Sequence, residues 1–143
     1  MSIYSERLAR LKRELSSEIK KRKTRKKKFK PNQLIMIDFI NGVTDKAVFE
    51  IKSMTITLKK GNASIGFRHI LERHFCKGCK GEVDMLDILN LDLIISRGLK
   101  LNTVGVSNSK NIVINYRNNN VEHNVILKKE RNDELIVSFY SVD

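Results

Sequence analysis

The 143-residue chain has no tryptophan, one proline, two cysteines and no long apolar run. Two cysteines are too few for the disulfide framework of a small secreted protein. No run approaches the roughly 18–20 apolar residues of a transmembrane helix, and no apolar stretch follows a charged start as in a secretory signal. We therefore expect an intracellular, cytoplasmic protein without a membrane partner, of a length typical of one domain.

Acidic residues are scarce in the first 30 positions, where 13 Lys and Arg accompany only 3 Asp and Glu. Residues 31–143 carry 15 basic and 13 acidic residues, so the net charge of +12 resides mainly in the N-terminal segment. We divide the chain into an amphipathic helix and basic arm, 1–30, and a nearly neutral α+β domain, 31–143. Any nucleic-acid function of that domain must rest on individual sites, since its bulk charge supplies little attraction.

The N-terminal segment begins with apolar residues at helical spacing, namely Tyr4, Leu8, Leu11, Leu15 and Ile19. They predict a helix over 3–19 that docks on the domain or on a second copy. Nine of the eleven residues at 20–30 are basic, which predicts an extended or fraying arm. Lys26 and Lys27 there could bind RNA phosphates. A solubilising tail or a localisation signal explains the same pattern equally well.

The patterns after Pro31 predict helices before a final group of strands. Segment 33–40 is apolar and β-favouring, 46–51 and 53–59 predict strands, and helical spacing predicts helices over 66–76 and 84–97. Alternation in 53–59 is typical of a half-buried strand. Asp84 is placed to cap the second helix and Gly98 to end it. Short polar breaks separate strands over 111–117, 121–130 and 134–143, which predicts an antiparallel meander and an α+β class.

The segment GFRHILERHFCKGC, 66–79, holds most of the groups that can perform chemistry. His69, His74, Cys76 and Cys79 are zinc-ligand types. Five residues apart on a helix, the two histidines diverge by roughly 140°, so a shared site requires the helix to end near His74. A redox-active pair would need a helix N-terminus, whereas these cysteines follow a helix. Small, half-buried cysteines with a structural role are the third interpretation.

Acid–base chemistry is a further interpretation of the same helix. His69 and Arg73 lie four residues apart on one helical face. Cleavage of an RNA phosphodiester needs a base for the 2′-hydroxyl proton, an acid for the leaving 5′-oxygen and a cation for the phosphate charge. A histidine can carry either proton near neutral pH. A helix with a solvated basic face is the alternative without function.

The order of these elements, with GNASIGFRHILERH before GEVDMLDILNLDLIISRG and a final ELIVSFYSVD, resembles the barnase–EndoU–colicin–RelE group of nucleases, in its phage and mobile-element branch. The resemblance covers about residues 50–143. It implies helices packed on an antiparallel sheet that ends in a three-strand meander, and a metal-independent endoribonuclease or toxin acting on RNA, with a protein inhibitor or antitoxin as a further partner and no cofactor. The cysteines are outside the family pattern, so zinc remains an alternative.

The resemblance points to His69 as the leading acid–base residue, beside Arg68, Arg73 and His74. Ser138 stands where the last strand of the family often has a hydroxyl, and Tyr140 is on the same face of that strand. His123 is an alternative second proton carrier, and Tyr116 and Arg117 are expected to contact phosphate or base. A non-catalytic nucleic-acid-binding or interaction protein, with a structural His/Cys cluster, is the second hypothesis.

Overall fold

The computed structural model describes residues 2–51, 54–62, 66–79, 82–100, 104–106, 112–118, 121–129 and 135–140; beyond residue 97 it describes the backbone course and the side chain of Leu127. The helices are α1 (Ile3–Thr24), α2 (Pro31–Ile40), α3 (Phe67–Arg73), α4 (Met85–Leu89) and α5 (Leu91–Lys100). The strands are β1 (Lys46–Ile51), β2 (Met54–Lys59), β3 (Val104–Val106), β4 (Ile112–Asn118), β5 (Val121–Lys129) and β6 (Leu135–Tyr140). The expected mixed α+β class is confirmed.

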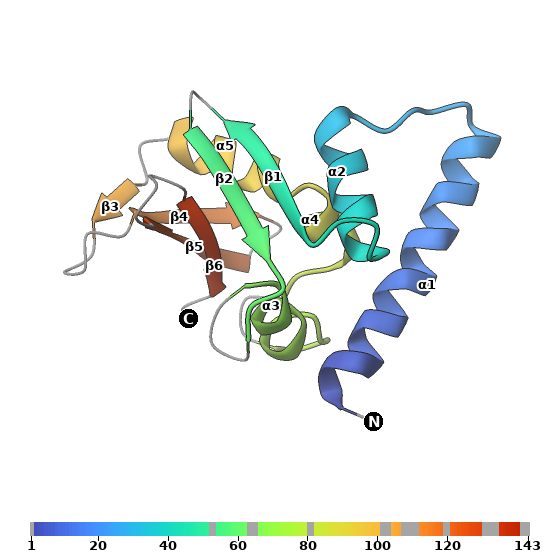
Figure 1. Ribbon diagram of the computed structural model, residues 1–143, viewed down its shortest axis with the longest axis horizontal. Coiled ribbons are helices and arrows are strands. Elements are labelled where there is room, and N and C mark those ends of the chain that lie inside the picture. Colours follow the sequence, from blue (N-terminus) through green and yellow to red (C-terminus); the bar gives the residue numbers. More distant parts are fainter. Residues whose placement is uncertain are drawn as a thin grey trace.

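The strands pair in the order β1-β2-β6-β5-β4-β3. Among the strands that the structure describes, β2 and β6 are the one parallel pair, with Ile56 opposite Leu135 and Thr57 opposite Ile136. The other neighbours are antiparallel. In Figure 1, α5 lies behind β1 and β2, α4 lies between β1 and α2, α3 lies beyond the end of β2, and α1 lies outermost, beyond α2. The short strand β3 had no counterpart in the sequence analysis.

One face of the β1–β2 hairpin packs against the hydrophobic core. Buried positions alternate along β1, and Phe49 pairs with Ile56 while Ala47 pairs with Leu58. The expected alternation in β2 is wrong at Thr57, which is also buried. The cause is the position of β2 inside the sheet, where Thr57 has cross-strand neighbours on both sides, in β1 and in β6.

Segment 33–40 is helical, which corrects its description as β-favouring. Pro31 occupies the first turn of α2, where a missing N–H costs no hydrogen bond, and the Gln33 side chain accepts from the Lys30 N–H at 2.8 Å. The buried positions are Gln33, Met36 and Phe39, in steps of three, and Ile40, four residues after Met36. Leu34 is 50 % exposed on the opposite side. The isoleucines indicated a strand, but burial follows the helical period.

The single helix expected over 84–97 is two helices, with a break at Asn90. Asp84 caps α4 as expected, because its side chain accepts from the Asp87 N–H at 2.8 Å. The Asn90 side chain accepts a 2.7 Å hydrogen bond from Gln33 of α2, which anchors the break to another helix. In α4, Ile88 and Leu89 are buried while Leu86 is exposed. Gly98 lies inside α5 and does not end it, so that prediction is wrong.

Helix α1 is longer than expected and takes in the first part of the basic stretch, which corrects its description as extended. Leu11 and Leu15 are fully buried in the same core as the helices that follow, so α1 docks on its own chain. Its C-terminal end is secured by Arg22, whose guanidinium lies 4.3 Å from the ring of Phe29 and donates to Gln33 at 3.3 Å. Within the described ranges, no helix combines the length and the apolar character needed to cross a membrane.

Gly66 determines how the chain enters α3. Its φ of 87° and ψ of −161° lie in a region that only glycine occupies readily. A Cβ at this position would lie 2.8 Å from the carbonyl oxygen of Lys59 and 3.2 Å from that of Lys60. The Lys60 carbonyl also accepts from the Arg68 N–H at 2.8 Å. The close approach of β2 to the first turn of α3 therefore requires a glycine.

We expect Gly66→Ala to lower the free energy of unfolding by about 2–4 kcal/mol, because it adds backbone strain to a steric clash. Gly42→Ala is the matched control, since Gly42 also has a positive φ, 78°, but no atom lies within 4 Å of the place that an alanine methyl would occupy. Strain alone should cost the control about 1–2 kcal/mol. Urea denaturation measures both values, and equal losses would show that crowding at Gly66 has no effect.

Candidate functional site

Helix α3 carries the predicted acid–base residues, and its apolar side attaches it to the core. Phe67, Ile70 and Leu71 are buried, while His69 is half-buried and Arg73 is exposed. The helix contacts β6 and α1. Arg73 therefore lies at the surface, whereas His69 lies at the rim of the core with its Nε2 atom buried, so a substrate can reach the His69 ring only from its other edge.

The two histidines of the segment converge because α3 ends early. The helix stops at Arg73, and His74 leaves the helical conformation with φ −126° and ψ −19°. The ring centroids of His69 and His74 are therefore 5.1 Å apart, with the rings edge to face at 76°. The divergence that a helix over 66–76 would have imposed does not occur. His74 is only 5 % exposed, and its carbonyl accepts from the Val83 N–H at 2.9 Å.

The arginines of α3 differ in their surroundings. Arg68 forms an ion pair with Glu72 one turn later, with 2.9 Å between Nε and Oε1. The side chain of Arg68 is 42 % exposed, so water screens this pair and its contribution to stability is small. Arg73 lies on the exposed side of the last turn. Of the two, Arg73 is the more accessible cation for a phosphate.

Two arginines of α1 cover the C-terminal end of α3. Arg7 donates to the carbonyl of Leu71 at 2.9 Å and to that of Glu72. Arg10 donates to the Phe75 carbonyl at 3.0 Å, and its guanidinium lies 3.7 Å from the centre of the Phe75 ring. The last carbonyls of a helix lack partners within it and carry partial negative charge. These two cations therefore stabilise the point at which α3 ends. The sequence analysis did not assign a role to either residue.

Cys76 and Cys79 form a disulfide, which the sequence analysis did not predict. The Cys79 N–H donates to the Cys76 carbonyl at 3.2 Å, and Gly78 has a φ of 82°. A turn with a positive φ at its third residue favours glycine there. The turn brings the two Cα atoms within 5.5 Å, inside the range of about 4.4–6.8 Å typical of disulfides. One disulfide between residues so close in sequence needs only a tight turn. It does not require the several disulfides that hold a small secreted protein together.

The zinc alternative requires these sulfurs as thiolates. In the disulfide neither sulfur is a thiolate, so Cys76 and Cys79 do not fit a zinc site in this form. In the part of the chain that the structure describes, no three His, Cys, Asp or Glu residues gather as a metal site. A zinc site with His69 and His74 stays a prediction for the reduced protein.

The remaining predicted residues lie on the C-terminal strands, and their side chains are outside the described part of the structure. Ser138 and Tyr140 are in β6, His123 is in β5, and Tyr116 and Arg117 are in β4. The backbone register places Tyr116 opposite His123 and Tyr140 opposite Asn124. Lys26 and Lys27, the other predicted contacts, are exposed beyond the end of α1.

The strand directions gather these positions at one edge of the sheet. β2 leads toward α3, and β6 runs parallel to β2, so the C-terminal ends of both strands lie at this edge (Figure 1). β5 and β4 alternate in direction, which brings the N-terminal end of β5 and the C-terminal end of β4 to the same edge. The five predicted residues of the strands therefore lie toward the same edge of the sheet as α3. They are Ser138, Tyr140, His123, Tyr116 and Arg117.

The register also divides these positions into two alternating sets. Leu127 is buried and pairs with Val137. His123 lies four residues before Leu127 in β5, so it belongs to the same face of the sheet as Leu127. Ser138 pairs with Ile126 and belongs to the other set. Since alternate positions of a strand face opposite sides, the register predicts that His123 and Ser138 do not serve one site together.

Comparison with protein-family models finds no match to this chain, and comparison with curated proteins finds none either. The assignment of a function therefore depends on the residues and on their arrangement.

We expect reduction of the Cys76–Cys79 disulfide to lower the free energy of unfolding by about 2 kcal/mol, the entropic value for a loop of four residues. Urea denaturation with and without dithiothreitol measures the change. The double variant Cys76→Ser, Cys79→Ser is the control and should not respond to the reductant. No response in the wild type would contradict a disulfide in solution. Stabilisation of the reduced protein by zinc would support the alternative site.

Proposed function

We propose that this protein is a metal-independent endoribonuclease that uses histidine acid–base chemistry. The observation that supports this most is the convergence of His69 and His74, 5.1 Å apart, at the end of a helix. That helix lies at the sheet edge to which the predicted residues of β4, β5 and β6 also belong. The resemblance to the barnase–EndoU–colicin–RelE group led to the same residues from sequence.

In the proposed reaction, His69 accepts the proton of an RNA 2′-hydroxyl, and the resulting oxygen attacks the adjacent phosphorus. The bond from phosphorus to the 5′-oxygen breaks, and a second acid protonates that leaving oxygen. We assign this second proton to His123, at the same edge of the sheet as α3, with His74 as the alternative. His74 is buried, so it is better suited to orient the His69 ring. Arg73 steadies the charge that develops on the phosphate.

Arg68 is less suited to the phosphate than Arg73, because Glu72 already pairs with it. Ser138, Tyr140 and Arg117 belong to the opposite set from His123, so in this proposal they contact a neighbouring phosphate of the RNA and not the one that is cleaved. Tyr116 pairs with His123 in the register and would lie beside the second proton carrier. A phage- or mobile-element toxin of this kind would need a protein inhibitor, and an acidic partner covering Arg73 and His69 would block the RNA.

The test is cleavage of mixed RNA by the purified protein in EDTA. His69→Ala should reduce the rate by about 10²–10⁴, the usual effect of removing one general acid or base. The variant should retain the thermal unfolding transition, because His69 is only half-buried. Arg13→Ala is the control, since Arg13 is exposed on α1 and should leave cleavage unchanged. Cleavage by the His69→Ala variant at the rate of the wild type would exclude this mechanism. Loss of cleavage by the wild-type protein in EDTA would also exclude it.

A second candidate function, non-catalytic binding of nucleic acid, is favoured by the basic stretch 20–30. Eight of its nine basic side chains are exposed, and Arg22 is the exception. Lys20, Lys21, Thr24 and Arg25 line an open hollow at the end of α1. Exposed cations at this density bind phosphates and release counterions. Deletion of residues 1–30 cannot test the idea, because it would also remove Leu11 and Leu15 from the core.

The combined substitution of Lys26, Lys27 and Lys28 by glutamine should therefore weaken binding to single-stranded RNA. It should also reduce the slope of log K against log salt by about 2, at about 0.7 for each phosphate that is no longer neutralised. The control is the same substitution of three exposed lysines of the domain, Lys46, Lys59 and Lys77. The two triple variants then have the same net charge. Equal slopes for both triple variants would show that the basic stretch has no specific role.

A further inference from the structure

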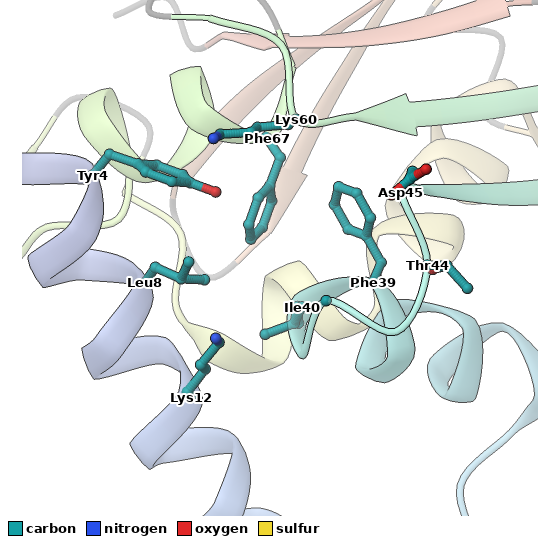
Figure 2. Close-up of a pocket in the computed structure, with 10 residues that line it drawn as sticks. Tyr4, Leu8, Lys12, Phe39, Ile40, Thr44, Asp45, Lys60 and Phe67 are labelled. Carbon is teal, nitrogen blue, oxygen red and sulfur yellow. The ribbon is translucent and has the colours of Figure 1, made fainter.

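A hollow of about 400 Å³ lies where α1, the end of α2 and the start of α3 meet. Its wall includes Tyr4, Leu8, Phe39, Ile40 and Phe67. Figure 2 shows the three aromatic rings around the opening and the polar side chains at its two ends. The volume is in the range of about 300–1,000 Å³ typical of small-molecule sites. None of the residues assigned to RNA cleavage lines it.

The aromatic rings form a connected wall. The ring centroids of Phe39 and Phe67 are 5.0 Å apart, and those of Tyr4 and Phe67 are 6.5 Å apart, both edge to face. Edge-to-face pairs leave one ring face turned away from the partner. Phe67 and Phe39 are only 2 % and 7 % exposed, so they present edges to the hollow, and Tyr4 is the half-buried ring of the three. An apolar aromatic wall of this kind favours the planar ring of an aromatic heterocycle over a saturated chain.

Charge is distributed unevenly along the hollow. Lys12 and Lys60 lie on the side of Tyr4, and the ammonium of Lys60 is 5.3 Å from the Tyr4 ring centre. Asp45 and Thr44 lie on the opposite side, in the loop that follows α2 (Figure 2). One end can therefore hold an anion, and the other can accept hydrogen bonds from N–H or O–H groups.

The phenol of Tyr4 adds a donor to the cationic end. Burial raises the pKa of Tyr4 above its ordinary value, and the nearby Arg68 offsets part of this effect. The hydroxyl therefore stays protonated through the physiological pH range. A protonated hydroxyl can donate to an anionic oxygen, as the two ammonium groups beside it can.

From this arrangement we propose that the hollow binds a nucleotide. Lys12 and Lys60 hold the phosphate with the Tyr4 hydroxyl, and the base enters the hollow against the exposed edges of Phe39 and Phe67. Asp45 and Thr44 accept hydrogen bonds from the base amino group or the ribose. The nucleotide is either a free monophosphate or one residue of an RNA chain. The inference does not depend on the proposed cleavage, because it uses none of the same side chains.

The test is calorimetric titration of the full chain with adenosine 5′-monophosphate, with adenosine and with a short oligoadenylate. Loss of one phosphate-binding ammonium, in Lys12→Met or Lys60→Met, should weaken binding of the monophosphate about tenfold. It should leave the weaker binding of adenosine unchanged. Asp45→Asn should weaken both ligands. Arg13→Met, a change at an exposed basic residue of the same helix, should bind like the wild type.

The two sources of the nucleotide are separated by the oligoadenylate. Binding at least tenfold tighter than that of the monophosphate, and sensitive to Lys12→Met, identifies an RNA subsite, whereas equal or weaker binding identifies a free-nucleotide site. His69→Ala should bind the monophosphate normally, which separates failure of this site from failure of the cleavage proposal. No detectable binding of the monophosphate by the wild type, or equal effects of Lys12→Met and Arg13→Met, would overturn the inference.

Discussion

The contact of Arg7 and Arg10 with the end of α3 is the interaction on which the candidate site depends. Their guanidinium groups bind the carbonyls of Leu71 and Glu72, which α3 leaves without helical partners, and that of Phe75 just after the helix. The chain can turn away after Arg73 because those carbonyls are satisfied from another helix. That turn places His74 beside His69. The N-terminal helix is therefore part of the site's framework, although its composition is that of a solvated arm.

The sequence predicted elements well where local chemistry and tertiary packing agree. Strand 46–51, the helix that begins after Gly66 and the Asp84 cap follow from alternation, spacing and hydrogen-bonding groups close in sequence. Segment 33–40 was misjudged because its isoleucines favour strands, while its cap and its burial pattern depend on packing. The break at Asn90 depends on Gln33, 57 residues away. A long-range hydrogen bond of this kind leaves no local signal.

The candidate site was predictable in its composition but not in its geometry. The residue types of 66–79 identified the histidines and arginines, yet their convergence depends on where α3 ends, and that depends on α1. The bond between Cys76 and Cys79 depends on a turn of four residues, which CKGC permits without requiring. The register puts His123 in one set and Ser138 with Tyr140 in the other, so the contribution of His123 to the histidine pair stays a prediction that excludes the other two.

The parallel pairing of β2 with β6 has a consequence for the order of folding. Ile56 meets Leu135, so most of the chain separates two strands that lie side by side. Closing so long a loop costs more conformational entropy than forming a hairpin, and such distant contacts slow folding. The β1–β2 hairpin with its helices, and the β4–β5–β6 ladder, each consist of contacts nearer in sequence. On a ribosome, the seam between them cannot form until β6 emerges, so the edge that carries the candidate site is completed last.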